Sequence, residues 1–136
     1  MTCLVTYGTF DLFHHGHLHL LKRCSALASE IHVGVSTDAF NMVKGKQSVW
    51  GYAKRSREVI KTGLVMSVFP ETSFQQKSQD ILRLGATLFV MGNDWEGEFD
   101  WLSQYTEVIY LPRTPNISTT LLKNKMNWTC NVSRCT

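Results

Sequence analysis

The chain has 136 residues, of which 43% are hydrophobic and 18% are charged, a composition typical of one globular domain. Its formal net charge of +3 is too small to indicate nucleic acid as a partner, and no apolar run is long enough to span a bilayer. The four cysteines form no C-x-x-C pair and show no metal-type spacing, which predicts no dedicated metal site and favours a reducing compartment.

Apolar runs alternate with amphipathic runs along the chain. Strands are predicted at residues 3–7, 31–36, 64–69, 87–91 and 107–111, and helices at 16–28, 51–62, 74–84 and 118–125. This alternation predicts an α/β protein with a Rossmann-like three-layer α/β/α sandwich and a five-stranded parallel sheet of order 3-2-1-4-5. Residues 37–50 form the longest stretch without predicted structure. We expect a single domain over residues 1–125 and a mobile tail over residues 126–136.

The first strand begins close to the amino terminus, so we expect no signal peptide and a cytoplasmic location. The junction that follows this strand reads His14-His15-Gly16-His17. Residues three apart share a helical face, so His14 and His17 can point the same way. Gly16 lets a ligand approach the backbone, and the start of a helix attracts anions. Two imidazoles at this position predict a site for a phosphate chain, rather than histidines without a task.

Segments after the fourth and fifth strands should join this junction, because ligands bind beyond the carboxyl ends of parallel strands where the strand order reverses. Neither G-x-G-x-x-G nor the P-loop lysine pattern follows the first strand, which disfavours hydride transfer and P-loop phosphotransfer. Ser118 and Thr119 open the last predicted helix and offer a second anion-binding end. The side chains able to neutralise a triphosphate are His14, His17, Lys44, Lys46, Arg55 and Arg113.

Together these motifs resemble those of the cytidylyltransferase family within the HxGH nucleotidyltransferase superfamily. The resemblance runs from about Val5 to Lys125, and its most specific parts are M-G-x-D-W-E-G at 91–97 and R-T-x-x-I-S-T-T at 113–120. It implies transfer of CMP from CTP to sn-glycerol 3-phosphate by direct in-line displacement, giving CDP-glycerol and pyrophosphate for teichoic-acid or other cell-surface polymer synthesis. It also implies a homodimer, and Mg²⁺ that is carried by CTP without a dedicated protein site.

The resemblance assigns roles to individual residues. His14 and His17 would bind the phosphates of CTP and stabilise the transition state, while Arg113 would hold the triphosphate. Lys44 and Lys46 would close over the reacting phosphates. Lys44 and Arg55 would also bind the acceptor, and Asp11 would orient this cluster or help to hold Mg²⁺ indirectly. The residues expected to bind the nucleotide are Gly8, Thr9, Phe10, Asp11, Gly16, Gly92, Asp94, Trp95, Thr114, Ile117, Ser118 and Thr119.

One departure from the family pattern keeps alternatives open. Members usually carry an arginine at the position of Gly63, so the rate, the acceptor or the dimer contacts could differ here. One alternative is an HxGH nucleotidyltransferase for another phosphomonoester, such as phosphocholine, phosphoethanolamine or a sugar phosphate. Another is a nucleotide-binding protein that has lost turnover. The short length and the lack of a K-M-S-K-S segment disfavour a fragment of a class I tRNA synthetase.

Overall fold

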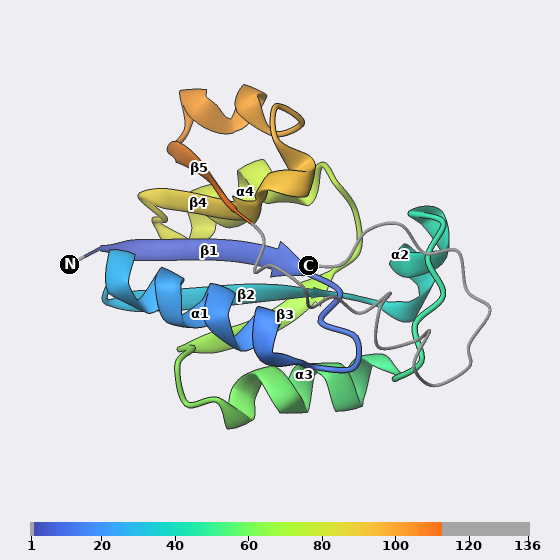
Figure 1. The fold of residues 1–136 in the computed structure, drawn as a ribbon. Coiled ribbons are helices and arrows are strands. Elements are labelled where there is room, and N and C mark those ends of the chain that lie inside the picture. The colour runs from blue at the N-terminus through green and yellow to red at the C-terminus, as the bar shows by residue number, and fades with distance from the viewer. Residues whose placement is uncertain (1, 113–136) are drawn as a thin grey trace.

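The computed structural model describes residues 2–112, which form a five-stranded sheet of order β3-β2-β1-β4-β5 with every neighbouring pair parallel (Figure 1). The strands are β1 (Cys3–Gly8), β2 (Glu30–Ser36), β3 (Ser67–Glu71), β4 (Leu88–Gly92) and β5 (Glu107–Leu111). The helices are α1 (His15–Leu27), α2 (Asp38–Val43), α3 (Tyr52–Lys61) and α4 (Gln76–Leu84), with 3₁₀ helices η1 (Asn93–Trp95) and η2 (Asp100–Gln104). The predicted fold class, parallel sheet and strand order are confirmed.

Apolar layers pack on both faces of the sheet, because successive side chains of a strand point to opposite faces. Leu4 of β1 belongs to the layer that includes Leu21 of α1 and Val59 of α3. Val5 belongs to the layer on the other face, which includes Ile81 of α4. Every residue of β1 is buried, as expected for a central strand of a parallel sheet. The three-layer architecture therefore matches the prediction.

The carboxyl ends of the strands gather at one edge of the sheet. From this edge β1 leads into the turn before α1, β2 leads into α2, and β4 leads into η1. Figure 1 shows α2 lying beyond the carboxyl ends of β1 and β2. Among the described helices, none is long and apolar enough to cross a membrane.

Residues 37–50 were predicted to lack regular structure, and this prediction was wrong because they contain α2. The hydroxyl of Thr37 caps this helix by accepting a hydrogen bond from the Phe40 N–H at 3.1 Å. Phe40 and Asn41 are buried. A helix of six residues is too short to show a hydrophobic period, so its cap and its tertiary contacts determine it.

The third strand was also misplaced, because it begins at Ser67 and not at Leu64. Gly63 ends α3 with a left-handed φ of 71°, and Leu64 then packs against the core before the ladder starts. Pro70 is tolerated because β3 is an edge strand. The other predicted elements agree to within two residues at each end. The helix predicted over 118–125 and the tail over 126–136 lie outside the described residues.

Candidate active site

Two histidine rings lie against each other at the start of α1. His14 is the N-cap, and its Nδ1 accepts a hydrogen bond from the Gly16 N–H at 3.0 Å. The Nδ1 of His17 accepts in turn from the His14 N–H at 3.2 Å, and the ring centroids are 3.9 Å apart. A ring nitrogen that accepts a hydrogen bond carries no proton, so each neutral ring is protonated on Nε2. The capping box therefore presents two Nε2–H donors at the positive end of the helix.

His17 is buried among aromatic rings, with the centroids of Phe10 and Phe13 at 5.3 and 5.4 Å. This burial is the main cause that lowers the pKa of His17 well below its usual 6.5. A proton on His17 would also be repelled by the nearby Lys46 ammonium and disfavoured by the adjacent His14 ring, which lowers the pKa of His17 further. His17 is therefore neutral at neutral pH and keeps its Nε2–H as a hydrogen-bond donor.

The turn between β1 and α1 is strained. Phe10 and Leu12 have φ values of 55° and 52°, in the left-handed region that non-glycine residues rarely adopt. Each such residue costs roughly 1–2 kcal/mol, and such strain often occurs at functional sites. Both side chains are buried, so packing holds the turn in this conformation. The strained turn leads directly to His14, the N-cap of α1.

Asp11 lies in the same turn and is buried. Its carboxylate accepts hydrogen bonds from the Val49 N–H at 2.7 Å and the Trp50 N–H at 2.9 Å. Asp11 thus attaches the segment between α2 and α3 to the turn that carries the histidines. That Asp11 orients the cluster stays a prediction. Its oxygens are turned towards backbone donors, so the structure gives no support for a metal ligand at this residue.

Arg55 of α3 is fully buried. Its Nε donates to the Trp50 carbonyl at 2.9 Å, and its Nη1 donates to the carbonyls of Thr9 and Ser36, each at 2.8 Å. Its Nη2 donates to the Asp38 carboxylate at 2.7 Å. Arg55 therefore joins the carboxyl ends of β1 and β2 to α2 and the following segment. This bonding disagrees with the predicted direct contact with the acceptor, and we infer that Arg55 is a positioning residue.

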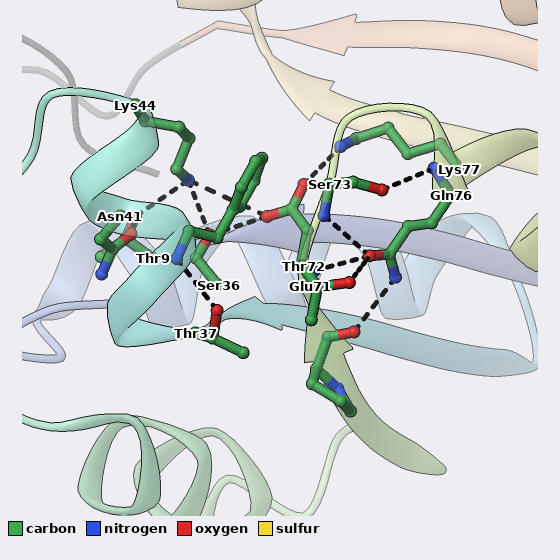
Figure 2. A network of polar contacts seen from close by, with 12 residues as sticks. Thr9, Ser36, Thr37, Asn41, Lys44, Glu71, Thr72, Ser73, Gln76 and Lys77 are labelled. Atoms are coloured by element: carbon green, nitrogen blue, oxygen red, sulfur yellow. Dashed lines mark hydrogen bonds and ion pairs between the residues drawn. The ribbon is translucent and has the colours of Figure 1, made fainter.

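A second cluster of charges lies at the carboxyl end of β3, where Glu71 stands between two lysines (Figure 2). Lys77 of α4 donates to the Glu71 carboxylate, and the Lys44 ammonium lies 3.9 Å from its other oxygen. Lys44 also donates to the Ser36 hydroxyl at 2.6 Å, and that hydroxyl donates to Glu71 at 2.7 Å. With both lysines protonated, Lys44, Lys77 and Glu71 together carry one more positive charge than negative. The buried carboxylate of Asp80 also acts on Lys77 and favours its charged form.

Burial affects both lysines of this cluster. The Lys44 side chain is only 5% exposed, and desolvation lowers its pKa to about 7 although Glu71 opposes the shift. Desolvation also lowers the pKa of Lys77. The Lys77 ammonium lies 4.6 Å from the ring centroid of Tyr7 and 5.2 Å from those of Phe74 and Phe99.

Next to Lys44 a narrow cavity of about 10 Å³ offers space for one water molecule. The residues around it are Tyr7, Gly8, Lys44, Glu71, Phe74, Met91, Trp95 and Phe99. The sequence-based site included Gly8, Lys44 and Trp95 but missed Glu71, Phe74 and Lys77. One signal could have found Glu71, because it follows the third apolar run at the same edge of the sheet.

A larger cleft of about 800 Å³ opens between α2 and residues 45–51. Its size lies in the range of small-molecule sites. The residues that line it are Asp38, Asn41, Met42, Gly45, Lys46, Gln47, Ser48, Val49, Trp50 and Gly51. Lys46 is buried, and its ammonium lies 6.0 Å from the Trp95 ring centroid. Lys46 therefore links the cleft to the residues that follow β4.

The remaining predicted residues lie at the same edge. The Thr9 hydroxyl contacts Asn41 at 3.1 Å and the Lys44 ammonium at 3.3 Å. Gly92 ends β4, while Asp94 and Trp95 lie in η1. Gly16 takes part in the cap of α1. The predicted residues Arg113, Thr114, Ile117, Ser118 and Thr119 lie outside the described part of the chain.

A metal ion held by the protein would need converging ligands. Among residues 2–112, the group of His, Cys, Asp or Glu side chains close enough to share an ion is Cys3, Glu30 and His32, at the opposite edge of the sheet. Mg²⁺ carried by the nucleotide phosphates stays a prediction.

A helix capped by the two histidines of the H-x-G-H turn thus lies at the carboxyl edge of a Rossmann-like sheet, as the resemblance to the HxGH nucleotidyltransferases predicted. The cytidylyltransferase-like family model matches residues 5–125. The chain is 48% identical to a glycerol-3-phosphate cytidylyltransferase of Bacillus spizizenii, over 93% of this chain and 98% of that protein. It is 44% identical to a glycerol-3-phosphate cytidylyltransferase of Staphylococcus aureus, over 93% of this chain and 96% of the relative. The chain belongs to the cytidylyltransferase-like family.

Solved structures show the same fold at lower identity. A lipopolysaccharide core biosynthesis protein from Thermoplasma volcanium matches with a TM-score of 0.75 and 19% identity, over 84% of this chain and 98% of that one. A pantoate-beta-alanine ligase from Francisella tularensis matches with a TM-score of 0.58 and 13% identity, over 93% of this chain and 69% of that one. These likenesses concern the fold alone.

Proposed function

We propose that this protein transfers CMP from CTP to sn-glycerol 3-phosphate, giving CDP-glycerol and pyrophosphate. The observation that carries the proposal is the pair of histidines that cap α1 and present Nε2–H donors at the carboxyl edge of the sheet. Near-full-length relatives with that activity in their names support the choice of nucleotide and acceptor.

The reaction is a direct displacement at phosphorus. A phosphate oxygen of the acceptor forms a bond to the α-phosphorus of CTP, and the bond from that phosphorus to the β-phosphate bridging oxygen breaks. The acceptor oxygen is already anionic at neutral pH, so catalysis depends on positioning and charge stabilisation. His14 and His17 donate hydrogen bonds to phosphate oxygens, and Lys46 adds positive charge. Mg²⁺ carried by the CTP phosphates would add further positive charge.

Lys44 lies between Thr9, which follows β1, and the Glu71–Lys77 pair (Figure 2). Its ammonium is held by Thr9 and Ser36 while Glu71 lies beside it. We assign the acceptor phosphate to Lys44, because its ammonium can donate a hydrogen bond to a phosphate oxygen and is held in place by Thr9 and Ser36. The burial of Lys44 strengthens its interaction with an anion.

Gly63 gives no reason to change the acceptor within the described site. It follows α3 and precedes β3, and Met66 just after it donates to the Ile31 carbonyl near the start of β2. This is the amino-terminal edge of the sheet, whereas the lysines and histidines lie at the carboxyl edge. Glycerol 3-phosphate therefore remains the acceptor that we propose.

The proposal extends to a cytoplasmic homodimer that supplies CDP-glycerol for cell-surface polymer synthesis. The family resemblance supports the dimer, and Met42 and Val43 of α2 offer apolar surface, being 78% and 74% exposed. Light scattering coupled to size-exclusion chromatography measures the oligomeric state, and a monomer at micromolar concentration would contradict the dimer.

Pyrophosphate release from a panel of nucleotides and phosphomonoesters tests the proposed reaction, with mass spectrometry of the product. We expect pyrophosphate release with CTP, glycerol 3-phosphate and Mg²⁺. We expect no release when unphosphorylated glycerol is supplied in place of glycerol 3-phosphate. Faster release with phosphocholine, phosphoethanolamine or a sugar phosphate would favour another acceptor. CTP binding without release in any mixture would favour a binding protein.

Variants of the paired histidines test the site. His14→Asn keeps a residue that can cap a helix but removes the Nε2–H donor, so we expect near-normal stability and turnover lowered about 100-fold or more. His17→Ala should lower turnover to a similar degree. His19→Ala on the same helix is the matched control, since His19 is exposed. Normal turnover in both His14→Asn and His17→Ala would contradict the assignment.

A further inference from the structure

Three potential metal ligands converge at the amino-terminal edge of the sheet, away from the candidate active site. Cys3 is the first residue of β1, and Glu30 and His32 lie in β2. In the parallel pair Cys3 stands opposite Glu30 and Val5 stands opposite His32, so alternation brings the three side chains to one face. Their ligand atoms all lie within 4.8 Å of one another.

The spacing of these ligand atoms suits a small cation. The Nε2 of His32 lies 3.8 Å from a carboxylate oxygen of Glu30. Nitrogen and oxygen ligands about 2.0–2.2 Å from Zn²⁺, and sulfur at about 2.3 Å, stand roughly 3.3–3.8 Å apart in a tetrahedral shell. Small side-chain rotations therefore suffice to bring the three ligands to one ion.

Neighbouring groups orient the ligands. The Nδ1 of His32 lies 2.6 Å from the Ser67 hydroxyl of β3, which fixes the ring with Nε2 turned to Glu30. The thiol of Cys3 points at the Leu84 carbonyl, 3.5 Å away, at the carboxyl end of α4. That end of a helix is negative and favours a cation.

The three residues are shielded to different degrees. Cys3 and His32 are 7% and 8% exposed, whereas the Glu30 side chain is 24% exposed. The carboxylate therefore forms the rim through which an ion and a water molecule can enter. A metal ion would displace the proton of the Cys3 thiol as the metal–sulfur bond forms.

We propose that Cys3, Glu30 and His32 bind one Zn²⁺ ion, with water as the fourth ligand. Thiolate and imidazole select Zn²⁺ over Mg²⁺ and Ca²⁺, which prefer sets of oxygen ligands. The ion would join the beginnings of β1 and β2 and stabilise the fold without entering the chemistry at the opposite edge. This site is independent of the proposed transferase activity.

Co²⁺ replaces Zn²⁺ as a spectroscopic probe in full-length protein. Cys130 and Cys135 also carry thiols, so the parent for this test is the double variant Cys130→Ser/Cys135→Ser. We expect one equivalent of Co²⁺ to give thiolate charge-transfer absorption in the near ultraviolet, and Zn²⁺ to abolish it. Adding Cys3→Ser should remove the band, and adding His32→Gln should weaken Co²⁺ binding at least tenfold.

Thermal unfolding provides a second measurement. Zn²⁺ should raise the Tm of the double variant by several degrees and leave the Cys3→Ser form unchanged, while Mg²⁺ should have no effect on either. Circular dichroism confirms that each variant folds. A missing Co²⁺–thiolate band in the folded double variant would overturn the proposal. So would a band or a Zn²⁺-dependent Tm shift that persists in the folded Cys3→Ser form.

Discussion

Replacing Arg55 with methionine should destabilise the protein strongly, because methionine fills part of the space but donates no hydrogen bond. The carbonyls of Trp50, Thr9 and Ser36 would lose a charged donor. The Asp38 side chain is 61% exposed and can turn to water. Hydrogen bonds to charged groups contribute about 1.5–3 kcal/mol each, and removing one partner of a buried charge network costs about 3–5 kcal/mol in total. We adopt the latter range for Arg55→Met.

For a chain of this length, such a loss lowers the Tm by roughly 10–20 °C. Thermal and urea unfolding measured by circular dichroism give the change in free energy. Arg57→Met is the matched control on the same helix, since Arg57 is exposed and should change stability by about 0.5 kcal/mol or less. Arg55→Lys keeps the charge but not the planar fork, so its stability should lie between those of wild type and Arg55→Met.

Steady-state kinetics separate positioning from direct contact. If Arg55 positions the segment that carries Lys46, kcat should fall and KM should rise for CTP as well as for the acceptor. A folded Arg55→Met variant with stability within about 1 kcal/mol of wild type, and with only the KM of the acceptor raised, would refute this reasoning. That result would restore the direct contact that the sequence predicted.

Three further predictions concern pH and packing. Because desolvation lowers the pKa of Lys44 to about 7 in the free protein, kcat/KM for glycerol 3-phosphate should fall as the pH rises above about 7 and stay level in Lys44→Arg; a level wild-type profile would exclude Lys44 as the residue that binds the acceptor phosphate. His17 has a lowered pKa, so below about pH 6.5 the unfolded chain takes up a proton that the folded protein does not. The free energy of unfolding should therefore fall on acidification by up to about 1.4 kcal/mol per pH unit. Urea unfolding at several pH values should show a smaller change of this free energy with pH for His17→Gln than for wild type. An equal change in both proteins would count against a buried neutral His17 ring. A Cβ at Gly34 would lie 2.4 Å from the Tyr7 ring, so Gly34→Ala should lower the free energy of unfolding by about 1–3 kcal/mol or more. Gly51→Ala should lower it little, because the nearest atom to a Cβ at Gly51 is 3.7 Å away. Equal Tm values for the two variants would contradict the close packing of Gly34 against Tyr7.

The sequence predicted the sheet well, because five apolar runs separated by helical segments leave few ways to order parallel strands. It failed at α2, where one capping threonine and two buried residues determine a helix of six residues. It also failed at Leu64, since an apolar run does not reveal where a ladder begins. Gly63 with positive φ and the packing of Leu64 decide that boundary.

The candidate site was predictable where its residues are close together in the sequence. His14 and His17 follow from their spacing at a strand–helix junction. Lys77 looks like a residue of a solvated helix face, and only its tertiary contact with Glu71 shows it to be buried. Arg55 was read as a ligand-binding cation because a sequence does not show that its hydrogen bonds are used inside the protein.

The convergence of Cys3, Glu30 and His32 was not predictable from the spacing of the cysteines. Its ligands come from two strands separated by a helix, so no short motif carries them. The pairing register of β1 with β2 brings them together.

The reciprocal cap of α1 also determines how little side-chain entropy the protein would lose when a ligand binds. Each histidine ring is held through Nδ1 by a backbone N–H of the helix start. Rotating either ring would break a helix cap and turn its Nε2–H away at the same time. The rotamers of both rings are therefore ordered when the protein folds, and a phosphate chain would meet donors that are already preorganised. Both rings should keep their rotamers when a nucleotide binds.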